Sequence, residues 1–348
     1  MVYLTITEGK ATILVPKSEK ISKKMGVFYN PIMKSNRDIT IALLNQFPKM
    51  RILDGLAASG VRSIRILKET KHKEVVANDI SRDSFLLMKS NFRKNKVKAE
   101  IKNQDINILL RESKGFDYID LDVFGSPNFA LDSSIVRLSR GGILAVTATD
   151  TSALAGTHPK ACLRKYWALP LHNELMHEMG LRILIRKIQL IGAQYEKALT
   201  PILAYYKDHY FRIFLRCEKG KKAVDKMLKN AEFLWYNSKS MERGIGIKEN
   251  MSISGPLWLG PLLDQKVCKN IDEDLVKMLL DEDKIPGIGF YDIHKICKTY
   301  KLKIPKFEDL TNKIKKSKYK VARTHFSLTG IKTNIPIKEL TKLIRSLA

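Results

Sequence analysis

From about residue 51 the chain alternates short apolar runs with stretches of helical periodicity. Apolar runs of four to eight residues are typical of buried strands, and helices between them predict a parallel sheet wrapped by helices. We expect strands at RILD (51–54), EVVAND (74–79), AEIKNQD (99–105), FDYIDLD (116–122), GGILAVTATD (141–150), LRILIRKIQLIG (181–192) and YFRIFLRC (210–217). Helices are expected at SIRILKET (63–70), over 82–94 and near 128–139.

The alternation of short apolar runs and helical stretches ends after Cys217. A polar stretch follows, and the residues beyond it mix short strands with Gly and Pro. The pattern predicts a domain boundary near residue 220. We therefore expect residues 1–220 to form a doubly wound α/β domain with an N-terminal extension, and residues 221–348 to form a smaller basic α/β domain.

The charge of the chain adds a class of partner to this picture. Lys and Arg number 62 against 36 Asp and Glu, which gives a net charge of +26 in 348 residues. Such an excess indicates a polyanionic partner, most often nucleic acid, although a uniformly basic surface is the simpler alternative. Between His294 and Arg323 stand eleven Lys or Arg and two acids, with Tyr300, Phe307 and Tyr319 interleaved. This run fits either a solvated helix face or a surface that binds a sugar-phosphate backbone.

Other sequence features limit the possible classes. No run of about 18 apolar residues is present, and the N-terminus alternates like a strand instead of resembling a signal peptide. We expect a soluble, cytoplasmic protein. The four cysteines are scattered and none forms a C-x-x-C pair, so neither a disulfide framework nor a metal site is expected.

The loop after the first predicted strand has the composition of a ligand-binding loop. In LDGLAASGVRSIR, Asp54 is followed by Gly55 and small residues up to Gly60, so that the backbone can approach a ligand closely. The loop lacks the third glycine of the G-x-G-x-x-G motif of dinucleotide enzymes. A purely structural loop is an equal alternative.

Acidic residues end the next two predicted strands as well. Asp79 stands where doubly wound folds place an acid against ribose hydroxyls, and Asp105 could accept a hydrogen bond from an adenine amine. Each could instead cap a helix. Acids at three consecutive strand ends fit a nicotinamide dinucleotide or S-adenosylmethionine, and Asp105 favours the second.

The fourth strand ends in an unusual sequence, LDVFGSP (121–127). Asp122 can accept hydrogens from a base amine, whose lone pair must localise before it can attack a methyl group. Phe124 offers a flat wall beside it, and Gly125 and Pro127 predict the turn that leaves room for a planar base.

These motifs resemble those of the tRNA guanine-26 N(2)-dimethyltransferases, archaeal branch. The matching stretches are GVFYNPIMKSNRDITIALL (26–44), ILDGLAASGVRSIR (52–65), DLDVFGSP (120–127), GGILAVTATDTSALAGTHPKACLRKY (141–166), GPLWLGPL (255–262) and ARTHFSLTGIKTN (322–334). They cover nearly the whole chain.

The resemblance implies a class I (Rossmann-like) methyltransferase domain and dimethylation of guanine 26 of tRNA from S-adenosylmethionine. It implies that Arg37 and Arg62 reach the methionine end of the cofactor, beside the loop at Asp54 and Gly55. It further implies that Asp79 binds the ribose and that Asp105 and the Ile106 backbone bind the adenine. Asp122 would accept the amine hydrogens, and Phe28 and Phe124 would hold a guanine flipped out of the tRNA. No obligate protein partner is implied.

The chain departs from the family pattern at two places. Relatives usually read D-P-F-G at the fourth strand, and Val123 replaces the proline here. Many relatives also carry paired cysteines of zinc-site type before GPLW, where this chain has none. We expect Trp235, Tyr236, Ile245, Ile247 and Ile253 to supply packing in that segment instead.

Other functions remain open at the level of the sequence. A methyltransferase could act on another tRNA guanine or stop after one methyl group. A non-catalytic tRNA-binding protein that keeps the cofactor fold is an alternative of a different class, which the intact set of acids at the sheet edge disfavours. A dinucleotide oxidoreductase is disfavoured by the missing glycine.

Overall fold

The structure is a computed structural model that describes residues 2–17 and 27–347. Its contacts divide the chain into two compact units. The first unit comprises residues 1–149, 191–202 and 212–225, and the second comprises residues 150–190, 203–211 and 226–348. This division is discontinuous along the sequence, and the boundary near residue 220 stays a prediction.

The central sheet has seven strands in the order β5-β4-β3-β6-β7-β9-β8. Pairing is parallel from β5 to β7. The strands are β3 (Arg51–Asp54), β4 (Glu74–Asn78), β5 (Glu100–Lys102), β6 (Phe116–Asp122), β7 (Leu138–Ala148), β8 (Lys197–Lys207) and β9 (Tyr210–Lys219). The strand order reverses direction at β3, which is the point where open α/β sheets bind ligands. The predicted doubly wound α/β fold is confirmed.

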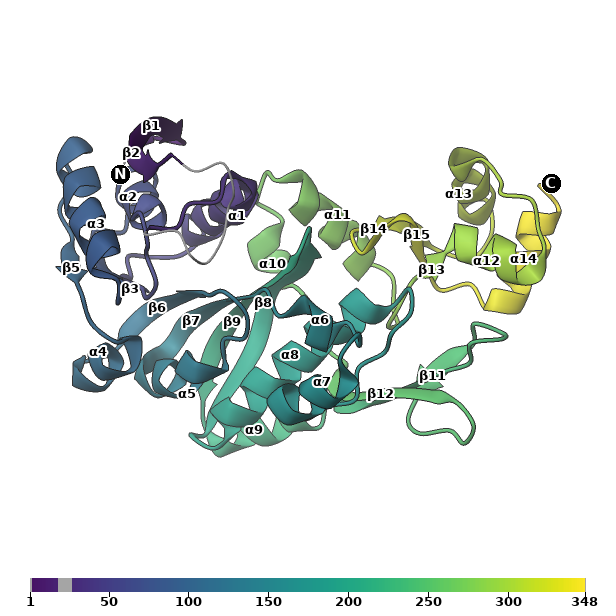
Figure 1. Cartoon of the computed structure of the whole chain (residues 1–348). Coiled ribbons are helices and arrows are strands. Elements are labelled where there is room, and N and C mark those ends of the chain that lie inside the picture. The colour runs from purple at the N-terminus through teal and green to yellow at the C-terminus, as the bar shows by residue number, and fades with distance from the viewer. Residues whose placement is uncertain (1, 18–26, 348) are drawn as a thin grey trace. The chain divides into compact units, whose positions relative to one another are not determined.

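Helices connect the parallel strands and cover both faces of the sheet. They are α2 (Val61–Glu69), α3 (Arg82–Lys94), α4 (Ile106–Glu112) and α5 (Asn128–Arg137). Figure 1 shows α2 and α3 on one face and α4 and α5 on the other. Side-chain caps fix two of the helix starts: the Ser81 hydroxyl accepts from the Ser84 amide, and Asp105 accepts from the Asn107 amide.

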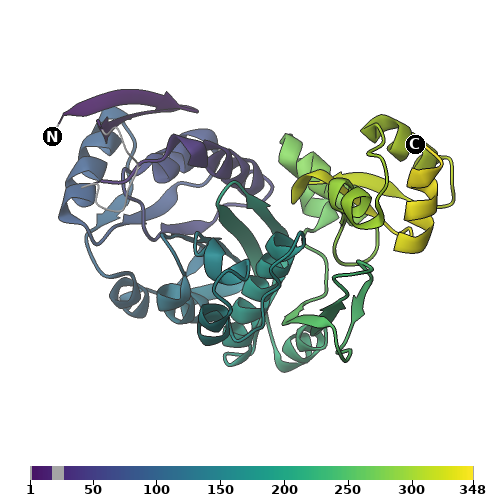
Figure 2. The ribbon, with the colours of Figure 1, turned by 45° about the vertical axis from the view of Figure 1, so that its right-hand side comes forward.

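The N-terminal extension is a hairpin of β1 (Tyr3–Glu8) and β2 (Ala11–Pro16) that lies over α2 and α3 (Figure 2). Asn91 and Asn95 of α3 hold β2 in the way that a neighbouring strand would. Each amide donates to and accepts from the β2 backbone, at Leu14 and Thr12 respectively, over 2.7 to 3.1 Å. After the segment that is not described, η1 (Pro31–Met33) and α1 (Lys34–Leu44) lead back to β3.

One strand prediction was wrong. LRILIRKIQLIG lies inside α8 (Met176–Ala193), and the strand that precedes β9 is β8, which starts at Lys197. Most side chains of this stretch are buried, charged ones included, so the helix has no continuous solvent-exposed polar face. Periodicity cannot distinguish a buried helix of that kind from a buried strand.

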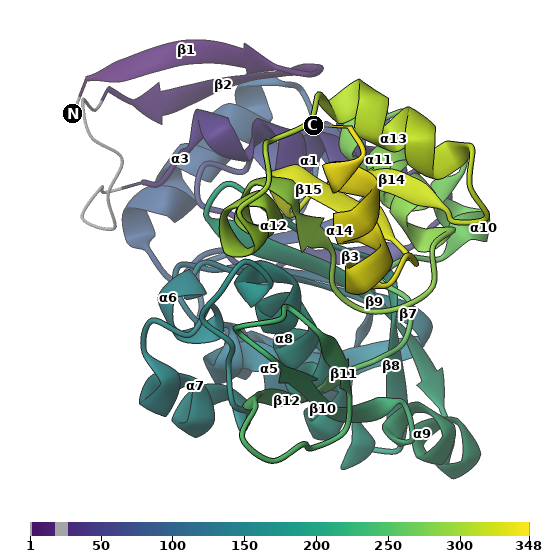
Figure 3. The same ribbon diagram turned by 90° about the vertical axis from the view of Figure 1, so that its right-hand side faces the viewer.

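The second unit contains most of α8, up to Leu190, and two small sheets. One sheet has the order β11-β10-β12 and the other β13-β15-β14. Helices α11 to α14 pack around the latter (Figure 3). The remaining elements are α6 (Thr151–Leu154), α7 (Pro159–Tyr166), α9 (Lys221–Leu228), β10 (Ala231–Tyr236), β11 (Arg243–Ile245), β12 (Ser252–Trp258), α10 (Gln265–Cys268), α11 (Asp274–Asp283), β13 (Tyr291–Asp292), α12 (Ile293–Tyr300), α13 (Phe307–Lys315), β14 (Val321–Thr324), β15 (Ser327–Thr333) and α14 (Ile337–Arg345).

The sheet at β10 to β12 differs in part from the packing that we expected. Tyr236 is buried and donates its hydroxyl to Glu174, which also pairs with Lys295 of α12. Ile245 and Ile247, in contrast, are 50% and 72% exposed and supply no core, so that part of the prediction was wrong. A polar contact between Tyr236 and Glu174 therefore ties this sheet to the rest of the second unit.

Two kinds of feature are absent from the part of the chain that the structure describes. Within residues 2–17 and 27–347 no helix combines the length and apolarity that crossing a bilayer requires. In the same ranges, His, Cys, Asp and Glu side chains nowhere gather in a group of three that could hold a metal ion. Cys162, Cys217, Cys268 and Cys297 are all buried free thiols.

Candidate active site

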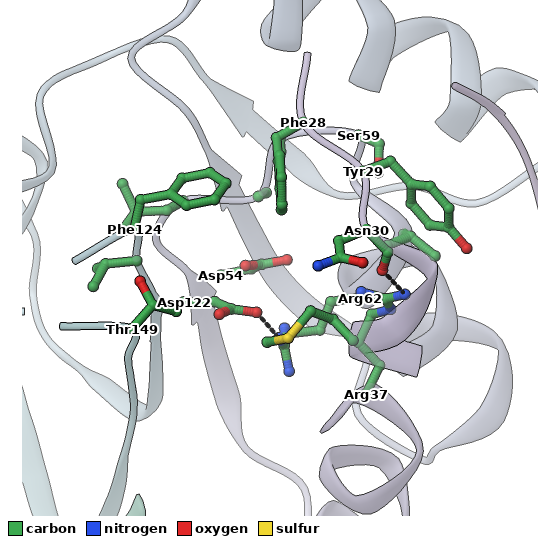
Figure 4. A pocket seen from close by; sticks show the side chains of 16 residues that line it. Phe28, Tyr29, Asn30, Arg37, Asp54, Ser59, Arg62, Asp122, Phe124 and Thr149 are labelled. Carbon is green, nitrogen blue, oxygen red and sulfur yellow. Dashed lines mark hydrogen bonds and ion pairs between the residues drawn. The ribbon is translucent and has the colours of Figure 1, made fainter. Parts of the chain in front are cut away.

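A pocket opens at the carboxyl edge of the sheet, within the first unit. The space between its side chains amounts to about 650 Å³ when the open solvent at its mouth is included. Figure 4 shows Phe28 and Phe124 on one side of the pocket, with Asp54 and Asp122 below them. The lining residues are Phe28, Tyr29, Asn30, Met33, Arg37, Asp54, Leu56, Ala57, Ala58, Ser59, Val61, Arg62, Asp122, Val123, Phe124 and Thr149.

The loop after β3 is shaped to lie close to its neighbours. The Gly55 amide donates to the Asp120 carbonyl at 3.0 Å. A Cβ at Gly55 would lie 2.9 Å from Ile106 and 3.1 Å from the Asp120 carbonyl, so the position has no room for a side chain. The loop therefore runs tightly over the sheet edge, and residues 56–59 line the pocket.

The predicted ribose and adenine acids are engaged with backbone amides. Asp79 accepts from the Ala58 and Ser81 amides, both at 2.9 Å, and burial raises its pKa. Asp105 caps α4 through the Asn107 amide at 2.8 Å. Among the described residues, the pocket lining includes none of Gly55, Asp79, Asp105 and Ile106, although all four follow strands that end at this edge.

Arg62 of α2 joins the pocket to the interior of the sheet. Its guanidinium pairs with Asp122 Oδ2 and approaches Asp120 Oδ2 at 3.5 Å. It also donates to Asn36 Oδ1 at 3.1 Å and to Thr40 Oγ1 at 2.9 Å. Both residues line the pocket, but the Asp122 side chain is 22% exposed and that of Arg62 only 5%, so the carboxylate is the more accessible of the two groups.

Asp54, at the end of β3, lies beside the same charges. Its carboxylate accepts from the Ser63 hydroxyl at 2.7 Å. Burial raises the pKa of Asp54 to about 6, although the attraction of Arg62 acts in the opposite direction. The pocket thus contains a carboxyl group that a nearby cation would favour in its ionised form.

Arg37 of α1 is held by the N-terminal hairpin. Glu8 accepts from Arg37 at 2.7 and 2.5 Å, from Arg65 at 2.9 Å and from the Tyr29 hydroxyl at 3.0 Å. Burial alone would raise the pKa of Glu8, but the two guanidinium groups outweigh it and lower that pKa to about 2. Burial and the Glu8 charge raise the pKa of Tyr29 to about 12. Glu8 is therefore a buried anion that fixes one wall of the pocket.

The two predicted aromatic residues meet across the pocket mouth. The Phe28 and Phe124 rings stand edge to face, with centroids 4.1 Å apart and an interplanar angle of 81°. Phe124 is 41% exposed, so part of its ring is accessible to a ligand. The side chain of Val123, between Asp122 and Phe124, is buried.

The sequence identified six of the lining residues in advance: Phe28, Arg37, Asp54, Arg62, Asp122 and Phe124. It did not assign a role to the polar lining residues Tyr29, Asn30, Ser59 and Thr149. All four lie inside stretches that carried the family resemblance, so their place in those stretches was the available signal. Glu8 and the Arg212 side chain beneath the pocket had no local signal, because their partners are distant in sequence.

Comparisons with known proteins give a consistent result. A family model described as N2,N2-dimethylguanosine tRNA methyltransferase matches residues 9–345. A tRNA (guanine(26)-N(2))-dimethyltransferase of Pyrococcus horikoshii is 40% identical over 98% of this chain and 98% of its own length. A tRNA (guanine(26)-N(2)/guanine(27)-N(2))-dimethyltransferase of Aquifex aeolicus is 37% identical over 98% of this chain and 96% of its own.

One solved structure is similar over almost the full length. Trm1 from Pyrococcus horikoshii, in complex with S-adenosyl-L-methionine, superposes with a TM-score of 0.90 at 38% sequence identity. The match covers 98% of this chain and 99% of that chain.

Proposed function

Because this chain belongs to the N2,N2-dimethylguanosine tRNA methyltransferase family, we propose that it methylates the exocyclic N(2) amine of guanine 26 in tRNA twice, with S-adenosylmethionine as the methyl donor. The class I methyltransferase fold and the family that the sequence predicted are both confirmed. The observation that carries the proposal is Asp122, a partly exposed carboxylate below two facing aromatic rings at the carboxyl edge of the sheet.

The chemistry of the pocket suits S-adenosylmethionine. This molecule carries an amino acid end, a cationic sulfur and an adenosine. Asp54 and Asp122 supply negative charge near a cation, and the closely packed loop at Gly55 lets backbone groups approach a ligand. We assign Arg37 and Arg62 to the methionine end.

The adenosine end is assigned to residues at the neighbouring strand ends. We assign Asp79 to the ribose, and Asp105 with the Ile106 backbone to the adenine. Support comes from the parallel register, which brings β3, β4 and β5 to the same edge. The Asn78 side chain also links the loops after them, since its amide donates to the Gly55 and Gln104 carbonyls at 3.1 and 3.0 Å.

Bound S-adenosylmethionine supplies an electrophilic methyl group. The residues of the chain orient the amine and remove its protons. Because Arg62 occupies Oδ2 of Asp122, we assign Oδ1 to the amine. The carboxylate accepts an amine hydrogen, which helps the nitrogen lone pair to localise. It would also take the proton that nitrogen must lose as the N–C bond forms and the bond between the methyl carbon and the donor's sulfur breaks, with that electron pair left on sulfur. Guanine N(2) carries two hydrogens, so the step can occur twice and then stops.

We assign Phe28 and Phe124 to the guanine itself. A base inside folded tRNA must be extruded to reach the pocket, and stacking on aromatic rings compensates for lost base stacking. Support comes from the exposed Phe124 ring and its edge-to-face contact with Phe28 at the mouth. In this arrangement a base would lie beside one ring and displace part of the contact between the two.

We assign tRNA backbone contacts to the second unit, at a groove between α11, α13 and β14. Lys284, Lys315, Lys320 and Arg323 line it together with Tyr319. The Arg323 guanidinium lies 4.1 Å from the centroid of the Phe307 ring, so aromatic and cationic groups are interleaved in space as well as in sequence. Such a surface suits phosphates and exposed bases.

The test uses unmodified tRNA transcript and labelled S-adenosylmethionine, with the methylated nucleotide mapped and its product resolved into mono- and dimethylguanosine. Label on N(2) of guanine 26 supports the proposal. Label at guanine 27 as well would match the name of the Aquifex aeolicus relative. No transfer under any condition would favour a tRNA-binding protein without catalytic activity.

A first variant isolates the assigned proton acceptor. Asp122→Asn keeps the shape of the side chain but removes the negative charge, so kcat should fall by a factor of about 10² or more. Cofactor affinity, measured by calorimetry, should change by less than about tenfold, because the adenosine end is untouched. Turnover close to that of the unaltered protein would exclude Asp122 from the mechanism.

A further inference from the structure

Arg212, on β9, is a fully buried cation of the first unit, with no exposed surface. It binds Asp120 with both terminal nitrogens, at 2.9 Å to Oδ1 and 2.7 Å to Oδ2. The hydroxyls of Thr40 and Thr147 accept from it at 3.1 Å each. Neither Arg212 nor Asp120 is among the described residues that line the pocket.

Stability alone explains such a group poorly. Removing an arginine and a carboxylate from water costs several kcal/mol per ion, and replacing such pairs with apolar residues is often neutral or stabilising. Apolar residues surround Arg212 on its own strand: Phe211, Ile213, Phe214 and Leu215 are all fully buried. An apolar side chain would suit this position if packing were its only purpose.

The contacts of Arg212 continue to the pocket without a break. Asp120 Oδ2 is shared by Arg212, by the Tyr118 hydroxyl at 2.6 Å and by Arg62 at 3.5 Å. Thr40 Oγ1 likewise lies within hydrogen-bonding distance of both guanidinium groups. Arg62 then pairs with Asp122. The order from the interior outwards is therefore Arg212, Asp120, Arg62, Asp122.

We propose that Arg212 is a positioning residue for methyl transfer, because it saturates Asp120 and so leaves Arg62 free to orient Asp122. Without Arg212, the fully buried carboxylate of Asp120 would depend on Arg62 as its cationic partner. Arg62 would then turn toward Asp120 and release the carboxylate that faces the amine. This inference rests on the proposed function, since it concerns the same reaction.

Loss of Arg212 would also change the balance of charge around Asp120. Two guanidinium groups, Arg62 and Arg212, face three carboxyl groups, Asp54, Asp120 and Asp122, and the Tyr118 hydroxyl lies among them as a further ionisable group. Removing one of two cations from such a group favours protonation of the carboxyl groups. The enzyme should then require a higher pH for full activity.

The experiment measures kcat and KM for tRNA between about pH 5.5 and 9 in the full-length protein. For Arg212→Met we expect kcat to fall about 100-fold from loss of orientation. KM for tRNA should stay within about threefold, because no tRNA contact is removed. The acid limb of the kcat profile should move up by about one pH unit.

Arg212→Lys keeps the positive charge but cannot donate to Asp120 through two terminal nitrogens. Its acid limb should therefore stay near that of the unaltered enzyme, while kcat remains reduced.

Lys197→Met is the matched control. Lys197 is also a buried cation of the first unit, but its ammonium donates to the carbonyls of Ile135, Val136 and Leu138 at the end of α5 and not to the carboxylates of the pocket. Its loss should lower the melting temperature and leave the acid limb in place.

A second variant covers the case in which Arg212→Met does not fold. Tyr118→Phe removes one hydrogen-bond donor to Asp120, so it should move the acid limb in the same direction as Arg212→Met but by less.

An Arg212→Met enzyme whose kcat and acid limb coincide with those of the unaltered enzyme would overturn the inference. So would a loss confined to KM for tRNA, or an acid limb that moves equally in Lys197→Met. If Arg212→Met fails to fold, an unmoved limb in Tyr118→Phe overturns it as well. The unaltered enzyme is measured in parallel, and its failure to methylate tRNA would count against the proposed function and not against this inference alone.

Discussion

Val123 stands where the family resemblance of the sequence leads us to expect proline, and the structure shows how the loop is held with valine at this position. Thr149, after β7, makes two hydrogen bonds to Gly125: its hydroxyl accepts from the Gly125 amide at 2.6 Å, and its own amide donates to the Gly125 carbonyl at 3.0 Å. Gly125 has a φ of +82°, a conformation that other residues rarely adopt. Burial of Val123 fixes the other side of the turn.

Thr149→Val tests the hydrogen bond between the Thr149 hydroxyl and the Gly125 amide. The change removes the hydroxyl acceptor and keeps the shape of the side chain, so we expect a loss of about 1 kcal/mol in the free energy of unfolding. We also expect kcat to fall about tenfold, since Phe124 and Asp122 flank the turn. Thr149→Ser keeps the hydroxyl and should restore both values. A Thr149→Val enzyme with unchanged kcat would show that the turn holds without this bond.

Asp79 and Asp105 show what residue-level reasoning could not decide. A carboxylate at a strand end can cap a helix or bind a ligand, and the sequence pattern is the same for both. Both side chains accept hydrogen bonds from backbone amides in the structure. A carboxylate has two oxygens and about four acceptor positions, so these bonds are compatible with a ligand but do not require one.

Among the elements, the N-terminal hairpin has a role that its sequence does not suggest. β1 is largely exposed, yet its last residue, Glu8, is 2% exposed and contacts Arg37, Arg65 and Tyr29. The hairpin therefore closes one wall of the pocket through a single carboxylate. Alternation of polar and apolar residues predicted the strands, but not that a glutamate beside the turn would be buried.

The hairpin should make the first unit sensitive to acid. The pKa of Glu8 is about 2 in the folded protein and 4.5 in its ordinary state. Its stabilisation is therefore complete above about pH 4.5 and is lost as the pH falls toward 2, and it amounts to about 3 kcal/mol. Glu8→Gln should be less stable at neutral pH and should lose less stability on acidification. Denaturant unfolding of both proteins at neutral and acid pH measures the difference, and parallel pH curves would contradict it.

Helix α8 illustrates a general limit at the same scale. The apolar stretch 181–192 was predicted as a strand, and only its packing reveals a helix. Arg182 and Lys187 within it are buried as well, so charged residues do not mark a solvent-exposed face of this helix. A short, largely apolar stretch of this kind can be read as a strand or as a helix from the sequence.

At the scale of the molecule, the net charge of +26 should dominate binding to tRNA. If six or more phosphates are contacted, affinity should fall by about 10³ or more between roughly 50 and 200 mM monovalent salt. Replacing Lys315, Lys320 and Arg323 together with Gln should reduce the slope of log affinity against log salt by about one for each phosphate that is no longer neutralised.

The control for this measurement removes equal charge elsewhere. Lys71, Lys94 and Lys98 are exposed lysines of the first unit, outside the basic run. Replacing all three with Gln should change the slope less than the first set does. Equal slopes for the two triple variants would mean that charge in general, and not the groove of the second unit, determines binding.

The sequence by itself determined the alternation of strands and helices from β3 to β7, the family, and six of the residues that line the pocket. It could do so because hydrophobic period and local motifs are properties of neighbouring residues. Only the tertiary structure showed that Glu8 closes a wall, that Thr149 holds the turn after Asp122, and that Arg212 lies behind Asp120. Those contacts join residues from 24 to 92 positions apart in sequence, and such pairs leave no pattern in a single chain. Their specificity comes from burial, which makes each charge or hydrogen bond depend on the one partner that folding brings to it.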